Sequence, residues 1–412
     1  MSQSPLRSPL IGLVTAVLST HTIVASADDG CPADGQPAKA QYDGPGEKYQ
    51  GCVGGAPYLI YVPKGWKAGG PLIMNMYGYW PTVPVVLSSP LAVYDVIAVP
   101  WLELGYAIAV SQSEYGWVPQ KRIADTELLR QYFIEKFGSG IASSPSVISG
   151  FSMGGMQTYH VIETNRNYHG ALAMCGFAMP SLSFLQKYVF STRLLFDFYF
   201  PGVLAGSVFD FPDRDHTLKN TCEALRRYIP GGPTNFFCAP MPANPPLLYL
   251  NPQHVQEYLR MTSTPAVDQI PSKVALHTEL LRELSVRLGG NIFDNTNEIY
   301  LSRPADNLLI PRRAATAKFT QEVEITGKLD RPVLAMHTYV DEFVPVETTR
   351  YYMDLTNQQG TAKNFVQLYT NGSGHCIFQP SELKAGLKLL DQWMRQNARP
   401  RPGDLLAAEP PH

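Results

Sequence analysis

A serine at position 152 stands between glycines, in the string "GFSMGG" of residues 150–155. A serine hydroxyl is a weak nucleophile that needs a base within hydrogen-bond reach and a third group to hold that base. The pattern G-x-S-x-G is short and common, but it permits a sharp turn that lifts the hydroxyl above a sheet. Here it follows the apolar run "PSVIS" and precedes the helical pattern "MQTYHVIE". We therefore expect Ser152 to be the nucleophile of an acyl-transfer reaction.

The candidate base is His375, in the string "YTNGSGHCIF". It follows the last predicted strand and precedes the last predicted helix. Gly372 and Gly374 allow the backbone to bend there, so that the imidazole can reach across to the nucleophile. None of the other histidines combines a strand end with such a glycine-rich turn. His337, which precedes the acidic loop, is expected to be structural.

The group that holds the histidine is expected in "VLAMHTYVDEFVP", where a strand pattern ends in two acidic residues. Asp341 falls where the strand-end loop turns. It is the first candidate to hold the tautomer of His375 and to stabilise the imidazolium. Glu342 is the fallback. Asp330 precedes the strand and should therefore lie at the opposite end of the sheet.

The negative oxygen of a tetrahedral intermediate needs hydrogen-bond donors. We expect one donor to be the backbone N–H of Met153, next to the nucleophile. The other is expected from the backbone N–H of Tyr79 in the loop "YGYW", where Gly78 permits close approach. A hydroxyl of Tyr77 or Tyr79 acting as the donor remains an open variant.

Aromatic residues follow several of the predicted strand ends. Because these ends should carry the catalytic groups, such side chains are the best candidates to line a substrate pocket. The predicted lining residues are Tyr77, Trp80, Tyr115 and Trp117.

These residues can meet only in a fold that brings the ends of several strands together. Strand and helix patterns alternate over residues 56–178, which favours a parallel sheet with right-handed crossovers. Residues 180–328 break the alternation with amphipathic helical pieces rich in aromatics and prolines, and we interpret them as a mainly helical insertion. The alternation resumes over residues 329–398. The polar segment 28–52 is predicted to be a loop, and residues 399–412 a flexible tail.

The first 27 residues have the features of a signal peptide. Arg7 supplies positive charge, an apolar stretch follows, and Ala25-Ser26-Ala27 fits the small-residue cleavage rule. The alternative is a membrane anchor, but the apolar run is short and interrupted for a bilayer span of about 20 residues. We expect a secreted or periplasmic protein without stable membrane insertion.

Six cysteines follow this segment. An even number in an exported chain suggests disulfides. Proximity in the sequence favours the pairs Cys31–Cys52 and Cys222–Cys238, which leaves Cys175 to pair with Cys376. A buried free thiol at Cys175 is the alternative.

Composition excludes several classes of protein. The chain has 412 residues, of which 45% are hydrophobic and 17% charged, as suits a folded protein with a large core. A net charge of −2 and the lack of a basic run give no sign of a nucleic-acid partner. No zinc-finger or H-E-x-x-H spacing is present, so we expect no metal and no cofactor.

The strings "GFSMGG", "YGYW", "HTYVDEFVP" and "GSGHCIF" resemble the α/β-hydrolase superfamily, in its order of serine, acid and histidine. The resemblance covers residues 56–178 and 329–398. It implies an α/β fold with a mostly parallel eight-stranded sheet flanked by helices. It also implies a helical cap between strands 6 and 7, where residues 180–328 fall, with 28–179 and 329–398 forming the core. Tyr77-Gly78 replaces the frequent His-Gly of the oxyanion loop, which leaves the second donor open.

The function implied is that of an exported serine hydrolase acting on a small-molecule or oligomeric carboxylic ester. A peptidase of the prolyl-oligopeptidase or aminopeptidase type would share the same three residues, and a carboxylate pair in the insertion would favour it. An acyltransferase is a further alternative, because "GFSMGGMQ" also resembles the homoserine acetyltransferase branch. A catalytically inactive binding module is disfavoured, because all three candidate residues are present.

Overall fold

The computed structural model describes residues 36–82, 90–138, 145–204, 218–225, 250–294, 319 and 323–406. The predicted signal peptide, Cys31 and Cys238 lie outside these residues. No helix in the described ranges is both long enough and apolar enough to cross a membrane.

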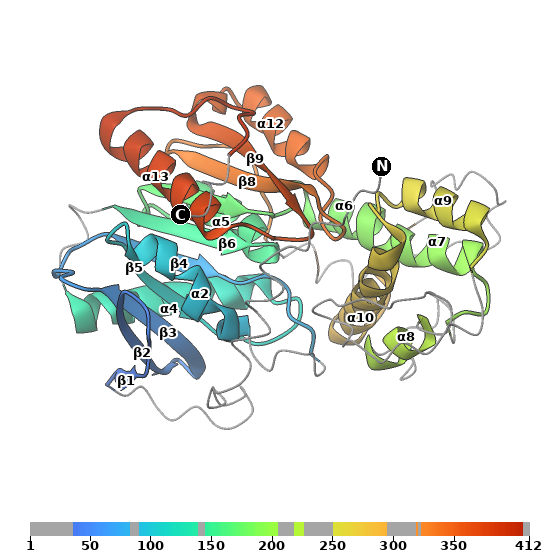
Figure 1. The fold of residues 1–412 in the computed structure, drawn as a ribbon, viewed down its shortest axis with the longest axis horizontal. Coiled ribbons are helices and arrows are strands. Elements are labelled where there is room, and N and C mark those ends of the chain that lie inside the picture. The colour runs from blue at the N-terminus through green and yellow to red at the C-terminus, as the bar shows by residue number, and fades with distance from the viewer. Residues whose placement is uncertain are drawn as a thin grey trace, which may run out of the picture.

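A single nine-stranded sheet forms the centre of the molecule (Figure 1). Its order is β1-β2-β3-β5-β4-β6-β7-β8-β9, in which the six strands from β5 to β9 along this order are parallel and β1, β2 and β3 pair antiparallel at one edge. The strands are β1 (Ala38–Ala40), β2 (Gly46–Val53), β3 (Ala56–Pro63), β4 (Leu72–Met76), β5 (Ala107–Ser111), β6 (Ser146–Phe151), β7 (Gly170–Met174), β8 (Val333–Val340) and β9 (Phe365–Ser373).

Two predictions about the sheet are wrong. It has nine strands instead of eight, and β1 and all of β2 except Val53 lie within residues 28–52, the segment predicted to be a loop. Strand β2 turns into β3 through Gly54-Gly55, whose φ angles are +57° and +80°, a two-residue hairpin that glycine permits. The strand was missed because β2 lies near the sheet edge and its largely polar sequence lacks a clear apolar alternation.

Helices cover both faces of the sheet (Figure 1). One face packs against α2 (Tyr94–Ile97), α3 (Val99–Leu102) and α13 (Pro380–Gln396), with Trp101 and Leu387 in the core. The other packs against α4 (Pro119–Phe137), α5 (Met153–Thr164) and α12 (Thr348–Gln358), with Tyr132, Tyr159 and Tyr352 in the core. Short 3₁₀ turns are η1 (Pro90–Val93) and η6 (Ala362–Asn364). This double cover explains the near-continuous apolar runs of the parallel strands.

The segment between β7 and β8 carries a group of helices to one side of the sheet (Figure 1). Stacked rings join it to the sheet, since Phe177 lies between Trp117 and Phe184, with ring centroids 6.0 and 4.0 Å away. The carboxyl ends of parallel strands share one edge, so these helices leave the sheet at the edge where β6, β8 and β9 also end. The helices are α6 (Ser181–Phe184), η3 (Leu185–Phe190), α7 (Ser191–Tyr199), α8 (Leu218–Leu225), α9 (Pro252–Met261), η5 (Val267–Gln269) and α10 (Ile270–Leu288).

Residues 404–406, which belong to the predicted flexible tail, lie along β9. The N–H of Tyr369 donates to the carbonyl of Asp404 at 3.1 Å, and the N–H of Leu406 donates to the carbonyl of Tyr369 at 2.8 Å. The side chain of Leu406 is buried. Strand β9 is the edge of the sheet, and the tail satisfies backbone groups that an edge strand leaves unpaired. Residues 407–412 lie outside the described ranges.

Candidate active site

Ser152 occupies the turn between β6 and α5, as the sequence predicts for a nucleophile. Its φ and ψ are +57° and −121°, a conformation that costs energy for any residue with a side chain. The glycines after it are required by close packing. A β-carbon at Gly154 would lie 2.1 Å from the carbonyl oxygen of Met76, and one at Gly155 would lie 2.6 Å from that of Met174. The glycine pattern therefore has a steric cause at each of these two positions.

The predicted oxyanion donors lie around this turn. Met153 opens α5, and N–H groups in the first turn of a helix have no carbonyl partner within the helix. On the other side, a β-carbon at Gly78 would lie 2.8 Å from Cβ and 3.2 Å from Oγ of Ser152. The loop after β4 thus passes directly against the nucleophile, and Tyr79 is the next residue along it.

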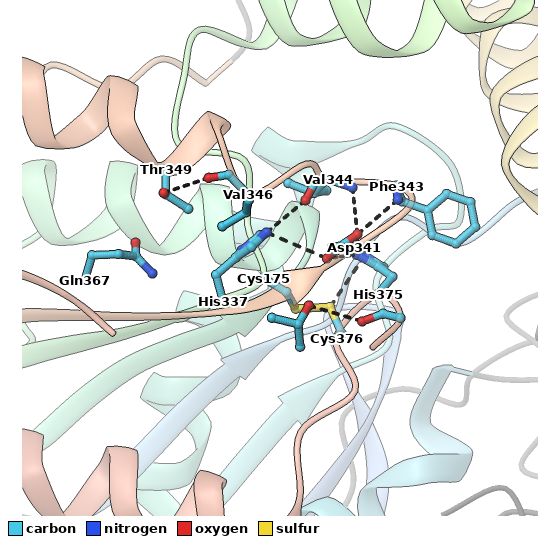
Figure 2. Close-up of polar contacts among 12 residues, drawn as sticks. Cys175, His337, Asp341, Phe343, Val344, Val346, Thr349, Gln367, His375 and Cys376 are labelled. Carbon is cyan, nitrogen blue, oxygen red and sulfur yellow. Dashed lines mark hydrogen bonds and ion pairs between the residues drawn. A yellow bond between two sulfur atoms is a disulfide. The ribbon is translucent and has the colours of Figure 1, made fainter. Parts of the chain in front are cut away.

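Asp341 and His375 are in direct contact (Figure 2). Nδ1 of His375 lies 2.9 and 2.8 Å from the two carboxylate oxygens. Oδ1 of Asp341 also accepts hydrogen bonds from the N–H groups of Phe343 (3.0 Å) and Val344 (2.8 Å). Burial of the carboxylate raises its pKa, but His375 and these hydrogen bonds outweigh burial and hold the pKa below its ordinary value. Asp341 is therefore an anion at neutral pH.

The same contact with Asp341 determines the pKa and the tautomer of the His375 imidazole. Burial lowers the pKa of His375, and the charge and hydrogen bond of Asp341, with a smaller contribution from Glu342, raise it above the ordinary value of 6.5. In the neutral ring, the carboxylate retains the proton on Nδ1, and Nε2 keeps the lone pair that can accept a proton. This is the arrangement that a general base requires.

Two neighbours of Asp341 do not replace it. Glu342 forms no hydrogen bond with the imidazole ring of His375, and its Oε2 is buried without a partner in the described part of the chain. Burial, and then the charge of Asp341, raise the pKa of Glu342. His337 contacts the carbonyl of Val344 at 2.8 Å through Nε2, and burial lowers its pKa, which agrees with the predicted structural role.

A disulfide between Cys175 and Cys376 lies next to His375 (Figure 2). The N–H of Ser152 donates to the carbonyl of Met174 at 3.0 Å. The next residue, Cys175, is bonded to Cys376, with 5.3 Å between their Cα atoms, and Cys376 directly follows His375. The predicted pair is confirmed, and the alternative of a free thiol at Cys175 is wrong. One backbone hydrogen bond and one covalent bond therefore connect the turn of Ser152 to His375.

Among the described residues, no hydrogen bond joins Oγ of Ser152 to Nε2 of His375. Nε2 lies 3.5 Å from Sγ of Cys376. The pair of Asp341 and His375 is formed, and the turn of Ser152 is linked to it through Met174 and the Cys175–Cys376 disulfide.

The other cysteines agree with a disulfide-rich chain. Cys52 and Cys222 are each disulfide-bonded. Their predicted partners, Cys31 and Cys238, lie outside the described residues, so those two pairings stay predictions.

The predicted lining residues lie at the strand ends but differ in exposure. Tyr77, Trp80 and Trp117 are buried, and Tyr115 is half-buried. The hydroxyl of Tyr77 donates to the carbonyl of Ser113 at 2.7 Å, so it is not free to act as an oxyanion donor. The buried hydroxyl of Tyr79 has no hydrogen-bond partner within the described residues. The lining role of these residues stays a prediction.

Helix α10 contacts the loops after β5 and β8, which the sequence did not predict. Glu283 accepts a hydrogen bond from the N–H of Trp117 at 3.1 Å, and Arg287 bonds to Glu114 at 3.0 Å. In the first half of α10, the ring of His277 lies 6.1 Å from that of Phe343, which lies 5.4 Å from His375. The spacing of Glu283 and Arg287 by four residues was a detectable signal for an ion pair, but not for its position over the strand ends.

In the described ranges, no three His, Cys, Asp or Glu side chains are grouped so that they could hold a metal ion.

This chain is similar to several proteins of solved structure. No family model and no curated protein matches the sequence. The chain is similar to feruloyl esterase B from Aspergillus oryzae (12% identity, TM-score 0.46, 86% of this chain and 81% of that one). It is similar to Candida antarctica lipase A (14%, 0.46, 91% and 85%). It is also similar to acylaminoacyl peptidase from Pyrococcus horikoshii (10%, 0.40, 87% of this chain), of which it spans only 42%.

The fold follows from the topology of the chain itself. A mostly parallel sheet carries helices on both faces, and β3 runs antiparallel to both of its neighbours. A serine stands in a tight turn between a central strand and the helix behind it. The chain has the α/β-hydrolase fold.

Proposed function

We propose that this protein is an exported serine hydrolase that cleaves a carboxylic ester. The observation that carries the proposal is the contact of 2.8 Å between Asp341 and His375, held beside the turn of Ser152 by a disulfide. Ser152 attacks the carbonyl carbon, while Nε2 of His375 takes the hydroxyl proton and then gives it to the departing alcohol. Water, deprotonated by the same nitrogen, releases the acid from the acyl-enzyme.

The negative oxygen of each tetrahedral intermediate is stabilised in this proposal by the backbone N–H groups of Met153 and Tyr79. The role of Met153 is supported by its position at the start of α5. The role of Tyr79 is supported by the close approach of the preceding residue, Gly78, to Ser152. Each such donor typically contributes about 3 kcal/mol to the transition state.

Residues 180–328 act as a cap over the strand ends in this proposal. The contacts of α10 with the loops after β5 and β8 support it, because a helix held at both loops bounds the space between them. A cap of this kind excludes water and shapes the pocket. Tyr77, Trp80, Tyr115 and Trp117 would form the wall opposite it.

The carboxylates of α10 favour an ester over a peptide substrate. A peptidase that captures an N-terminal amine needs carboxylates whose charge is free. Glu279 pairs with Arg282 at 2.6 Å, and Glu283 pairs with Arg287. Each acidic side chain is thus neutralised within its own helix.

Export is supported by cysteine chemistry. Cys175, Cys376, Cys52 and Cys222 are all disulfide-bonded, and disulfides persist mainly in oxidising compartments. Together with the predicted signal peptide over residues 1–27, this favours the cell exterior or the periplasm.

A fluorophosphonate label, followed by peptide mapping, tests the nucleophile. The label should appear on Ser152 and vanish in Ser152→Ala. The same preparation should cleave p-nitrophenyl esters and leave aminoacyl p-nitroanilides intact. Label on another residue would contradict the assignment of the nucleophile, and anilide cleavage without ester cleavage would indicate a peptidase.

A further inference from the structure

Arg122 is a completely buried arginine on α4, beside the loop that follows β4. Its Nη1 donates to the carbonyl of Gly78 at 2.9 Å and, more weakly, to that of Tyr77 at 3.4 Å. Its Nη2 donates to the carbonyl of Glu114 at 3.3 Å, and its guanidinium lies 4.0 Å above the ring of Tyr77. One buried side chain therefore binds the loop after β4 and the loop after β5.

The hydrogen bond to Gly78 fixes one particular peptide group. In a trans peptide the C=O and the following N–H point in opposite directions. Because the carbonyl of Gly78 points at Arg122, the N–H of Tyr79 points away from it. That N–H is the second proposed oxyanion donor, and Gly78 itself borders Oγ of Ser152.

The charge of Arg122 is unusual for its location. Buried arginines are normally paired with carboxylates. Among the described residues Arg122 forms no ion pair, and its partners are backbone carbonyls and an aromatic ring. A cation bound to a carbonyl oxygen polarises the peptide, which makes the N–H on its other side a stronger donor.

We propose that Arg122 is a positioning residue that orients and polarises the Gly78–Tyr79 peptide, so that the N–H of Tyr79 stabilises the oxyanion. This inference rests on the proposed function. It adds a residue whose described contacts are with the loops after β4 and β5 and that no sequence motif indicates.

The test compares Arg122→Met and Arg122→Lys with Arg130→Met. Arg130 lies on the same helix and is also largely buried, but it pairs with Glu127 and does not contact the loop. Active-site titration normalises every rate to the number of competent sites, so a smaller fraction of folded protein does not lower the measured kcat. We expect Arg122→Met to lower kcat about 100-fold with KM within about twofold, because one oxyanion donor is typically responsible for a factor of 10²–10³. Arg122→Lys should recover part of this loss, and Arg130→Met should retain kcat.

A trifluoromethyl ketone separates positioning from a general structural role. Its adduct with the serine carries an oxyanion, so its affinity should fall in Arg122→Met by the same factor as kcat/KM. A merely structural arginine would change the melting temperature and the fraction of titrated sites, but not the affinity per site. Unchanged kcat and inhibitor affinity per site in both Arg122 variants would overturn the inference.

An NMR measurement on the wild-type protein covers the case in which the variants do not fold. Labelling glycine carbonyls with ¹³C and tyrosine amides with ¹⁵N selects only Gly-Tyr peptides, and the sequence has two, Gly78-Tyr79 and Gly105-Tyr106. The Tyr79 resonance should shift when the ketone binds, whereas the Tyr106 resonance should not. A stationary Tyr79 resonance in the inhibited enzyme contradicts the inference. Absence of fluorophosphonate label on wild-type Ser152 would instead contradict the proposed function itself.

Discussion

The strand-end edge of the sheet and the helical insertion are built by different means. At the edge, Ser152, Cys175 and Cys376 all have positive φ angles, of +57°, +45° and +60°. Such backbone is costly for residues other than glycine and persists only where the surroundings fix it. Here a disulfide and a buried acid–base pair supply that constraint.

The described helices of the insertion pack against one another through apolar and aromatic side chains. Phe196 lies against Phe200 and Tyr258, with ring centroids 5.0 and 5.7 Å away, and Phe190 stacks on Phe293 at 5.0 Å. Packing of this kind tolerates substitutions that conserve volume. We therefore expect individual residues at the strand-end edge to be indispensable for activity, and residues in the core of the insertion to matter mainly for stability.

The largest expected effect comes from the nucleophile. Ser152→Ala should lower kcat about 10⁶-fold, as removal of the catalytic serine does in subtilisin, and leave the melting temperature nearly unchanged. Ser149→Ala on the same strand is the control. It removes a buried hydrogen bond of 2.9 Å to the carbonyl of Leu172, so it should lower stability by about 1 kcal/mol and retain activity. A large loss of stability in Ser152→Ala would show that the serine is structural.

The second-largest effect on kcat is expected for the acidic residue of the site. Asp341→Asn should lower kcat about 10⁴-fold, because an amide no longer favours the productive tautomer of His375. Glu342→Gln is the matched control, since this neighbouring carboxylate does not bond to the imidazole ring. Equal losses in the two variants, measured by steady-state hydrolysis of a p-nitrophenyl ester, would contradict the assignment of Asp341.

The same pair predicts the pH profile. The base acts only when neutral, and Asp341 raises the pKa of His375 above 6.5. The acid limb of kcat/KM should therefore have its midpoint above pH 6.5, with activity falling as the pH falls through it. In Asp341→Asn the residual activity should show this midpoint at a lower pH.

The disulfide should have a smaller effect on rate. Replacing both Cys175 and Cys376 with serine should lower kcat per titrated site about 100-fold, because a misplacement of about 1 Å is sufficient for such a loss. Unfolding should become easier by about 2–5 kcal/mol, measured with urea. Cys52→Ser removes a disulfide at the far edge of the sheet and should reduce stability only. Full activity in the double variant would show that packing alone positions His375.

The smallest effect on rate is expected in the insertion. Phe196→Leu should lower stability by about 1–2 kcal/mol, a typical cost for a core substitution. Per titrated site, kcat should stay within about twofold of the wild type, because the ring lies in a cluster separate from the strand ends. A clear loss of kcat per site would show that the two regions are energetically coupled.

The sequence by itself determined the local elements. The strand, turn and helix around Ser152 follow from apolar runs and glycine spacing, and the parallel strands from β4 to β9 follow from the same patterns. It also reduced the candidates for the acid to two adjacent residues. These are properties of neighbours along the chain, where backbone preference and periodicity act. The Cys175–Cys376 pair, whose members are 201 residues apart, followed only by elimination after the cysteines close in sequence had been paired.

Only the tertiary structure decided what depends on contacts between distant segments. It selected Asp341 over Glu342 as the partner of His375, paired residues 404–406 with β9, and placed Arg122 against the carbonyl of Gly78. The β1–β2 hairpin belongs here too, because a polar strand near an edge is stabilised by pairing more than by its own pattern. Such contacts arise when the sheet closes and its strand ends meet, and no local spacing encodes them.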